Sequence, residues 1–335
     1  MSRYTEAHAK PIGPGDSRPT ALQIVQDEGL EGKLKGKIFV ITGTSSGLGI
    51  ETVRALAVTG ATLYLTARNL AKAKAALANI FDSTHMKLFE MDQESLGSVR
   101  SAAKAILAET DRVNVLINNA GIMGVKNLQF TKDGHELQFG TNHLSHFLFF
   151  QLLKPALLAA STSDFPSRVV NVASAGHRFH GINESGDYNY EKSGYDAFQA
   201  YGQSKTANIY MANEIERRYG SRGLHATSLH PGVIDTPLSK HIDPAQLSEI
   251  LTTGTVASQM KSPEQGAATT VWAAVGKEWG SRGGRFLTDC MEAVPEQDDS
   301  DIYDGRFYAP HAYDAEKEKR LWKDSLELVG LEDDY

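Results

Sequence analysis

From Ile38 to Gly49 the chain reads IFVITGTSSGLG, an apolar run followed by a turn that contains three glycines. The apolar run predicts a buried strand, and helical spacing of apolar residues over 49–59 predicts a helix directly after the turn. Glycines at such a turn let the backbone approach a pyrophosphate, and the helix N-terminus offers free N–H groups to it. We therefore predict a phosphate-binding turn made by Gly43, Ser45, Ser46, Gly47, Leu48 and Gly49.

Two other interpretations of this turn remain open. It is also consistent with a tight turn that binds no ligand. Residues 43–47 match the G-x-S-x-G nucleophile elbow of serine hydrolases, with Ser45 as the nucleophile. That elbow requires a downstream acid and a histidine at strand ends, and nothing else in the sequence singles out such a pair.

Strand-like and helix-like segments alternate along most of the chain. This alternation predicts a parallel sheet covered by helices on both faces, with ligands bound beyond the carboxyl ends of the strands. The expected strands are 38–41, 61–66, 87–91, 113–117, 168–172, 224–229 and 284–287. The expected helices between them are 49–59, 70–79, 96–109, 140–159, 201–219 and 263–275.

The two ends of the chain differ from this alternating core. Residues 1–36 begin with a polar stretch rich in proline and glycine, which predicts a mobile arm, and continue into a short helix capped by Thr20. Residues 37–290 are expected to form the main domain, with a lid at about 237–261. Residues 291–335 are expected to form an extension that carries an amphipathic helix.

The end of the second expected strand, TARN at 66–69, indicates which dinucleotide would bind. In NAD-binding versions of this arrangement an acidic residue about 20 positions past the glycines bonds the ribose 2′-hydroxyl. No Asp or Glu occurs over 52–81. A guanidinium suits a 2′-phosphate, so Arg68, beside Asn69, favours NADP(H) over NAD. The alternative for Arg68 is a solvated surface charge.

Two further strand ends fit the same pocket. Asp92, followed by Gln93, is placed to accept a hydrogen bond from an adenine amino group. Asn119, Ala120 and Gly121 follow the fourth expected strand, where the cofactor ribose would lie. Each of these segments, taken alone, is equally consistent with ordinary turn chemistry.

A tyrosine and a lysine provide the candidate acid/base pair. Tyr201 and Lys205 lie at i and i+4 of an expected helix, and so on one face of it. An unperturbed tyrosine has a pKa of about 10, and a nearby cation lowers it. We predict that this pair moves a proton at a carbonyl or alcohol oxygen. Ser174 is expected to hydrogen-bond that oxygen, and Asn142 to hold a water that links Lys205 to solvent.

A second Y-x-x-x-K pattern runs from Tyr188 to Lys192. Ser193 and Gly194 follow it and do not continue a helix, whereas helix-compatible residues follow Lys205. The pair at 201 and 205 is therefore preferred. His143 and His146 have i, i+3 spacing without an obvious third ligand, and we interpret them as part of a helix surface rather than a metal site.

The combined motifs resemble those of the short-chain dehydrogenase/reductase family over about residues 37–290. The matching motifs are TGTSSGLG at 42–49, NNAG at 118–121, Asn142, Ser174, Tyr201 with Lys205, and PGVIDT at 231–236. Closer similarity is to retinol-dehydrogenase-like and WW-domain-oxidoreductase-like members, especially fungal ones. It rests on the TARN strand end, the long gap between Ser174 and Tyr201, and GGRF at 283–286.

The resemblance implies a Rossmann-type α/β fold, that is, a doubly wound parallel sheet in a single domain, with a nicotinamide cofactor. It implies that Tyr201 is the general acid/base, that Lys205 lowers its pKa and binds the ribose hydroxyls, and that Asn142 completes a proton relay. Ser174 would orient the substrate oxygen. The carboxamide would be held by Pro231, Gly232, Ile234 and Thr236.

Two departures from the family pattern bear on these expectations. Many NADP-using relatives carry a basic residue in the glycine turn, where this chain has Ser45 and Ser46, so the NADP preference depends mainly on Arg68. The membrane anchor of many retinol dehydrogenases is not seen here, which weakens an inference to retinoids. The resemblance also implies a homodimer or homotetramer.

Composition excludes several classes of function. The 335 residues include 34 Lys and Arg and 41 Asp and Glu, a net charge of −7 that is unsuited to nucleic acid. A single cysteine, Cys290, cannot form an internal disulfide or a CxxC zinc site. We expect no metal. Neither a signal-peptide core nor a bilayer-spanning segment is visible, so we expect no membrane association and a cytoplasmic location.

We therefore predict an NADP(H)-dependent alcohol dehydrogenase or carbonyl reductase that interconverts a ketone or aldehyde and an alcohol by hydride transfer. Aromatic residues between Ser174 and Tyr201 suit a flat or bulky carbonyl substrate, or else they simply pack that loop. The alternative is a non-catalytic cofactor-sensing or interaction protein on the same fold. The Tyr201–Lys205 pair argues against it, because a binding module needs no acid/base pair.

Overall fold

The computed structural model describes residues 2–252, 256–297 and 304–333. The expected lid at 237–261 and the expected extension at 291–335 therefore lie partly outside the described residues. The main sheet has the strand order β3-β2-β1-β4-β5-β6-β7-β8, parallel except for β8. Its strands are β1 (Ile38–Thr42), β2 (Thr62–Ala67), β3 (Met86–Glu90), β4 (Val115–Asn118), β5 (Ser167–Val172), β6 (Leu224–His230), β7 (Arg285–Thr288) and β8 (Met291–Glu292). A second small sheet pairs β9 (Val294–Pro295) with β10 (Phe307–Tyr308).

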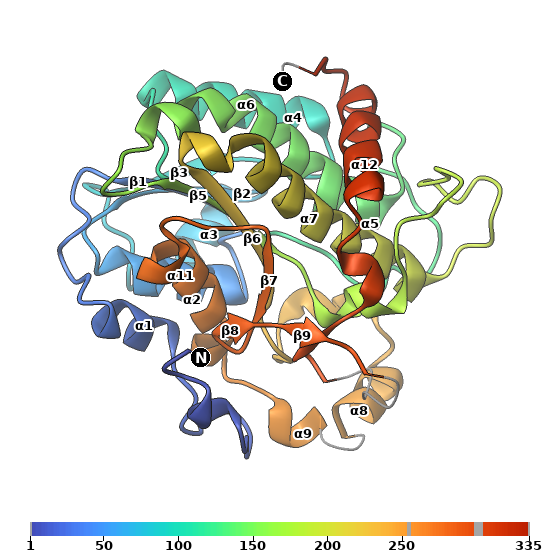
Figure 1. Ribbon diagram of the computed structural model, residues 1–335, viewed down its shortest axis with the longest axis horizontal. Coiled ribbons are helices and arrows are strands. Elements are labelled where there is room, and N and C mark those ends of the chain that lie inside the picture. The colour runs from blue at the N-terminus through green and yellow to red at the C-terminus, as the bar shows by residue number, and fades with distance from the viewer. Residues whose placement is uncertain (1, 253–255, 298–303, 334–335) are drawn as a thin grey trace.

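Helices cover both faces of the sheet, as Figure 1 shows. One face carries α4 (Leu96–Glu109), α6 (Ser145–Ala160) and α7 (Ala197–Tyr219), and the other carries α1 (Ala21–Asp27), α2 (Leu48–Ala57) and α11 (Ala268–Val275). The last helix, α12 (Ala315–Leu328), packs on α7. The remaining helices are α3 (Leu70–Ala76), α5 (Leu137–Phe139), α8 (Pro244–Thr252), α9 (Val256–Gln259) and α10 (Pro263–Gly266). The predicted α/β fold, doubly wound around a parallel sheet, is confirmed.

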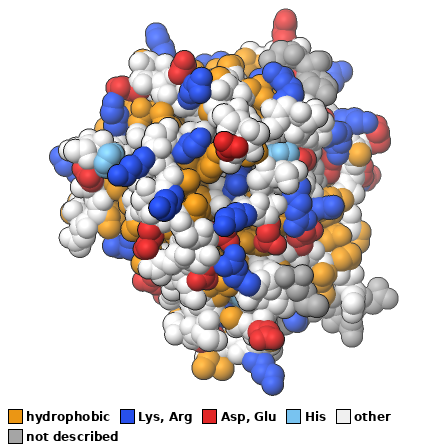
Figure 2. Space-filling view, turned by 60° about the vertical axis from the view of Figure 1, so that its left-hand side comes forward, with side chains coloured by type: hydrophobic (Ala, Val, Ile, Leu, Met, Phe, Trp, Pro, Cys, Tyr) orange, Lys and Arg blue, Asp and Glu red, His pale blue; other side chains and the backbone are white. Residues whose placement is uncertain are grey.

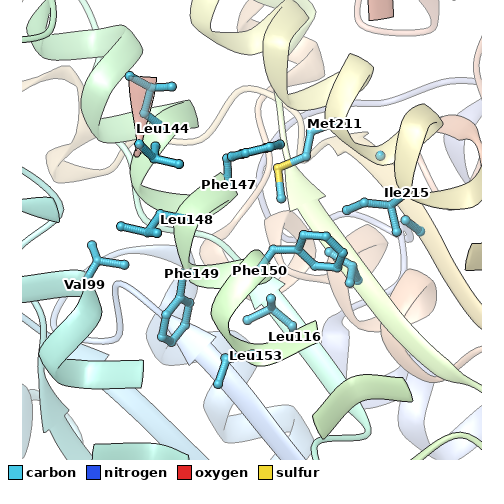
Figure 3. Close-up of a cluster of buried hydrophobic side chains, with 14 of the residues drawn as sticks. Val99, Leu116, Leu144, Phe147, Leu148, Phe149, Phe150, Leu153, Met211 and Ile215 are labelled. Carbon is cyan, nitrogen blue, oxygen red and sulfur yellow. The ribbon is translucent and has the colours of Figure 1, made fainter. Parts of the chain in front are cut away.

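The core on the α6 side is built around four consecutive buried apolar residues, 147–150. A helix that is apolar on all sides has to be buried, and Figure 3 shows α6 lying among side chains of α4, β4 and α7. Val99, Leu116 and Met211 are the contributions of those three elements that the figure labels. The packing fixes α7 against the sheet and so fixes the orientation of whatever α7 presents at its N-terminal end.

The strand order places the site. β2 and β3 lie on one side of β1, whereas β4 lies on the other, so the direction of winding reverses between β1 and β4. Ile41 pairs with Ile117 in parallel register, which brings the carboxyl ends of both strands to the same edge. Ligands of doubly wound sheets bind at such a reversal. β4, β5 and β6 are buried along their whole length, as expected of central parallel strands.

Most element boundaries agree with the sequence prediction to within a few residues, and two differ for local reasons. The catalytic-candidate helix begins at Ala197 rather than Tyr201, because the Asp196 side chain accepts hydrogen bonds from the amides of Phe198 and Gln199. The helix expected over 140–159 contains a π-helical turn at Gly140–Leu144 before α6 begins. Thr20 caps α1 as predicted, since its side chain accepts from the Gln23 amide.

The N-terminal arm packs against the domain, which differs from the prediction of a mobile segment. Arg18 is buried and donates hydrogen bonds to Asp16 (2.8 Å) and to the carbonyls of Gln259 and Met260. Tyr4 is buried too, and its hydroxyl donates to Asp27. A polar segment is mobile when its charges remain in water. In this arm the Arg18 guanidinium is buried with enough hydrogen-bond acceptors to hold the segment against the domain.

The surface carries charges of both signs. Figure 2 shows one face of the molecule, on which acidic and basic side chains are interspersed. Among the described residues no helix is both long enough and apolar enough to cross a bilayer.

Replacing Arg18 with Met should lower the free energy of unfolding by about 3 kcal/mol, because it leaves the buried Asp16 carboxylate unpaired. Burial alone would raise the pKa of Asp16, but hydrogen bonds from Arg18 and the Ile12 amide hold it well below its ordinary value. The pair therefore stabilises the fold above pH of about 4, and its contribution is lost as the pH falls further. Urea titrations between about pH 3 and about pH 7 measure both effects.

A matched control is Lys87→Gln, which removes an exposed ion pair with Glu109 and should change stability little. Equal effects of the two substitutions would contradict a structural role for the arm.

Candidate active site

The glycine turn after β1 has the shape of a phosphate cradle. Gly43 and Gly47 have φ values of +73° and +60°, which side chains rarely adopt. A Cβ at Gly43 would lie 2.8 Å from the Ala120 Cα, and one at Gly49 would lie 2.2 Å from the Gly43 carbonyl oxygen. The helix α2 starts at Leu48 and has no side-chain cap, so its first N–H groups are available to an anion. Ser45 and Ser46 are half-buried within this turn.

Asn119 joins the end of β4 to the end of β1. Its side-chain amide donates to the Thr42 carbonyl oxygen at 2.8 Å, and the Thr42 hydroxyl accepts from the Asn119 and Ala120 amides, each at 2.9 Å. Gly121, the next residue, packs against two catalytic candidates. A Cβ there would lie 3.2 Å from Asn142 Oδ1 and 3.5 Å from Lys205 Nζ. The predicted residues Asn119, Ala120 and Gly121 are therefore brought to the glycine turn.

Thr42 and His146, which the sequence analysis did not identify as site residues, complete this junction. The Thr42 hydroxyl lies 2.9 Å from His146 Nε2, and His146 Nδ1 lies 2.9 Å from the Asn142 carbonyl oxygen. Because a carbonyl only accepts, Nδ1 carries the proton and Nε2 accepts from Thr42. Burial lowers the pKa of His146 to about 4, so the ring stays neutral. The interpretation of His143 and His146 as a helix surface is wrong, because both are buried; the apolar residues around them were the available signal.

Arg68 and Asn69 follow β2, and Asp92 and Gln93 follow the neighbouring β3. The exposed Arg68 guanidinium lies 2.7 Å from a Glu94 carboxylate oxygen. The Asn69 side chain caps α3, and Asp92 accepts from Lys132 at 2.8 Å, so both have local structural roles in addition to any binding role. Among the described residues, the buried side-chain nitrogen of Gln93 has no hydrogen-bond acceptor.

Ser174 and Tyr201 meet at the end of β5. Ser174 begins the turn η3 (Ala175–Phe179) and Tyr201 lies in the second turn of α7. A Cβ at Gly176 would lie 2.7 Å from Tyr201 Cε1 and 3.3 Å from Ser174 Oγ, so a glycine is required where the two hydroxyl-bearing residues converge. The two predicted residues are thus side by side.

Lys205 and Asn142 lie directly behind this pair. Lys205 Nζ donates to the Val172 carbonyl oxygen at 3.0 Å and lies 5.6 Å from the centroid of the Tyr201 ring. The Asn142 amide donates to Ser204 Oγ at 2.9 Å, and its oxygen accepts from the Ile122 amide at 2.9 Å. All four predicted catalytic candidates therefore gather within one buried cluster at the carboxyl edge of the sheet.

The electrostatics of the pair differ from the sequence-based expectation. Burial raises the pKa of Tyr201 to about 12, although its hydrogen bond with Ser174 acts in the opposite direction. Burial also lowers the pKa of Lys205 to about 7. We expected Lys205 to lower the pKa of Tyr201. In the protein alone, removal of both groups from water outweighs their attraction and favours the two neutral forms.

The segment that follows β6 lies over the glycine turn. A Cβ at Gly47 would lie 3.6 Å from Thr236, and one at Gly266 would lie within 2.8 Å of both Ile234 and Leu48. Lys261 anchors the segment from behind, because its amide donates to the Val233 carbonyl oxygen and its Nζ to that of Pro231. Gly232 has a φ of +108°. Of the residues predicted from PGVIDT, Ile234 and Thr236 thus lie beside the glycine turn and the start of α2, whereas Pro231 and Gly232 lie against Lys261 on the same segment.

The competing tyrosine and the loop histidine have structural partners instead. The Tyr188 hydroxyl donates to Asp324 on α12 at 2.6 Å, and Tyr188 lies outside any helix. His177 Nδ1 lies 2.7 Å from the Ser174 carbonyl oxygen, and its Nε2 accepts from the Ala309 amide. Among the loop aromatics, the half-exposed Phe179 packs edge-to-face on Phe198, with ring centroids 5.9 Å apart.

The rival chemistries have little support in the described parts of the chain. Over residues 2–252, 256–297 and 304–333, no three His, Cys, Asp or Glu side chains are grouped to hold a metal ion. Within those same ranges, Ser45 forms no hydrogen bond with a histidine, which a hydrolase elbow would need.

Comparison with known proteins agrees with the geometry. Residues 37–247 match the family model of the short chain dehydrogenases. The chain is 48% identical to the short-chain dehydrogenase/reductase prx1 of Penicillium roqueforti, over 98% of this chain and 95% of prx1. It is 35% identical to human retinol dehydrogenase 13, over 89% and 86% of the two chains. It is 33% identical to the WW domain-containing oxidoreductase of Pongo abelii, over 94% and 72%.

The fold is also similar to solved structures. An uncharacterized protein from Mycobacterium paratuberculosis superposes with a TM-score of 0.66 at 31% identity, over 89% of this chain and 95% of that chain. The predicted resemblance to retinol-dehydrogenase-like, WW-domain-oxidoreductase-like and fungal proteins is confirmed by these relatives.

The lowered pKa of Lys205 predicts how stability depends on pH. Between pH of about 7 and about 10.5 the unfolded chain carries a protonated lysine whereas the folded chain does not, so folding releases a proton. The stability of the wild type should therefore rise with pH relative to Lys205→Met, by up to about 1.4 kcal/mol per pH unit. Denaturant titrations of both proteins between about pH 7 and about pH 9.5 give this difference. Parallel curves would show that Lys205 stays charged in the folded protein.

Proposed function

Because this chain belongs to the short-chain dehydrogenase/reductase family and is therefore an oxidoreductase, we propose that it interconverts a ketone or aldehyde and an alcohol with NADP(H) as the cofactor. The observation that carries the proposal is the convergence of Tyr201 and Ser174 at the carboxyl edge of the sheet, with Lys205 and Asn142 behind them. A phenol and a hydroxyl side by side can share one substrate oxygen.

The cradle fits a dinucleotide. The glycine turn and the open N-terminus of α2 would take the pyrophosphate, and the buried side-chain nitrogen of Gln93 would donate to an acceptor near the end of β3. The segment 231–236 would cover the nicotinamide end. When bound, the nicotinamide supplies or accepts the hydride at the carbonyl carbon.

The preference for NADP(H) rests on Arg68. Its guanidinium is exposed at the end of β2, and its partner Glu94 is exposed enough that the ion pair contributes little. Exchange of that carboxylate for a 2′-phosphate would therefore cost little free energy and would restore a charge-assisted contact. Glu94 itself is the nearby acidic group that opposes a phosphate, so the balance between the two residues sets the preference.

The proton chemistry favours the direction of reduction. A tyrosine whose pKa is raised stays protonated near neutral pH, and in that form it can donate to the oxygen of a carbonyl that becomes an alkoxide. Ser174 would hold the same oxygen by a hydrogen bond. Lys205, whose Nζ lies 5.6 Å from the centroid of the Tyr201 ring, would stabilise the phenolate that remains and would return a proton to it. A water held by Asn142 would then reprotonate Lys205 from solvent.

The substrate region and the cellular setting are part of the same proposal. The half-exposed pair Phe179 and Phe198 lies on the two segments that carry Ser174 and Tyr201, which suits a flat or bulky apolar carbonyl compound.

Burial raises the pKa of the lone cysteine, Cys290, to about 12, so its thiol is unreactive. We place the enzyme in the cytoplasm, as a homodimer or homotetramer.

Tyr201→Phe should lower kcat/KM for carbonyl reduction by about 10² to 10⁴, because it removes the proton donor and leaves the cradle intact. The measurement is NADPH oxidation across a panel of aldehydes, aromatic ketones and quinones, with NADPH affinity determined separately by fluorescence. Tyr188→Phe is the matched control and should retain full activity. If the wild type binds NADPH but reduces nothing, and Tyr201→Phe behaves identically, the non-catalytic cofactor-sensing function is favoured.

Arg68→Gln should weaken NADPH binding about tenfold or more while NADH binding stays unchanged, because only NADPH carries the 2′-phosphate. Lys132→Gln provides the control, since it removes another exposed cation from the same sheet edge, where Lys132 pairs with Asp92. An equal loss of NADPH affinity in both variants would indicate a general electrostatic effect. A loss of NADH affinity in Arg68→Gln would contradict a phosphate contact.

A further inference from the structure

Glu136 is a fully buried carboxylic acid that the proposed chemistry does not use. One carboxylate oxygen accepts from the Gln138 amide at 3.0 Å and the other from the Phe139 amide at 2.7 Å. Its own amide donates to the Asn189 side chain at 2.8 Å. Burial raises its pKa to about 7, against the opposing hydrogen bonds. In the part of the chain that the structure describes, no cation forms an ion pair with it.

Burying a carboxyl group without a countercharge is costly. Glu136 caps the start of a continuous helical run, because α5, the π-helical turn and α6 follow one another without a break. The neighbouring contacts give it a second role. Gln138, also fully buried, accepts from the Gly124 amide at 2.9 Å and donates to the Ala197 carbonyl oxygen at 2.8 Å. It donates as well to the hydroxyl of Tyr195, which in turn donates to the Val125 carbonyl oxygen at 2.7 Å. The side chains of Gln138 and Tyr195 thus join the loop after β4 to the start of α7, and Glu136 holds the backbone from which the Gln138 side chain projects.

Both segments lead directly to catalytic candidates. Ala197 is the first residue of α7, one turn before Tyr201. The loop after β4 also contains Ile122, whose amide and carbonyl both bond the Asn142 side chain. From Glu136 the chain continues through α5 into the π-helical turn that holds Asn142. Displacement of Glu136 would therefore be transmitted to Tyr201 and to Asn142 by short hydrogen-bonded routes.

The loop beside Tyr195 is strained. Tyr190 has a φ of +57°, and its ring packs edge-to-face on Tyr195 with centroids 5.5 Å apart. Its buried hydroxyl has no hydrogen-bond partner among the described residues. A tyrosine keeps such a backbone conformation only where its surroundings over-determine it. Hydrogen bonds on both sides of Tyr190 provide that restraint, because Asn189 accepts from the Glu136 amide and Asp187 accepts from the amides at 191 and 192.

We propose that Glu136 is a positioning residue. Through Gln138 and Tyr195 its carboxylate holds the loop after β4 and the first turn of α7 in the arrangement that brings Tyr201 to Asn142 and Ser174. The kinetic part of this inference rests on the proposed function, whereas the structural part does not.

The test compares Glu136→Gln and Tyr195→Phe with the control Tyr188→Phe, which removes a tyrosine hydroxyl from the same loop but faces α12. The amide of Glu136→Gln can accept only one of the two backbone N–H groups and places its own N–H₂ against the other. We expect amide hydrogen exchange at 122–125 and 197–201 to accelerate about tenfold in the first two variants, and exchange in the control to match the wild type.

The kinetic measurement separates positioning from general stability. We expect kcat for carbonyl reduction to fall about tenfold in Glu136→Gln and Tyr195→Phe, with a smaller change in the KM for NADPH, because Asn119 fastens the cradle to β1 through its own hydrogen bonds with Thr42. Faster exchange with an unchanged kcat would overturn the positioning role, and so would unchanged exchange at 122–125 and 197–201. If Glu136→Gln does not fold, Tyr195→Phe decides by the same criteria. A wild type that reduces no carbonyl compound would overturn the proposed function, while the exchange comparison would still decide whether Glu136 holds the two segments.

Discussion

The close approach of two backbones between β1 and β4 is the constraint on which the site depends. A single added carbon at Gly43 would meet the chain at Ala120, and one at Gly49 would meet the turn itself. Asn119 and Thr42 then fasten the two strand ends with hydrogen bonds. The π-helical turn that carries Asn142 is tied to the same contact, because His146 bridges the Thr42 hydroxyl and the Asn142 carbonyl oxygen.

Burial gives this site its chemistry as well as its shape. Tyr201 and Lys205 are both almost completely buried, so the protein alone favours a phenol and an amine rather than an ion pair. Removal from water therefore sets the protonation of both groups together.

The sequence was sufficient for the sheet and its winding, because both depend on local pattern: apolar runs and glycines at a turn. The four catalytic candidates were selected from i, i+4 spacing and from the family resemblance. The structure brings them together, and their catalytic roles stay a prediction. What could not be predicted depends on contacts between distant segments. Asp196 was not identified as the cap that lengthens α7, and two acceptors of Arg18, the carbonyls of Gln259 and Met260, lie more than two hundred residues away from it. The hydrogen-bonding roles of His146 and Glu136 were missed because they depend on burial, which the identity of a polar residue does not predict. The direction of the Tyr201 pKa shift was misjudged for the same reason.

The position of helix α12 has a consequence for how the protein folds. It covers α7 and α6 through Trp322, whose ring packs edge-on against Phe147 and Phe150, and the chain just before it reaches His177 beneath Ser174. These contacts join α12 to a helix that lies far earlier in the chain. Until that long-range contact forms, the apolar surface between α12 and the helix that carries Tyr201 stays exposed to water. A chain in which α12 has not docked would therefore be prone to aggregation.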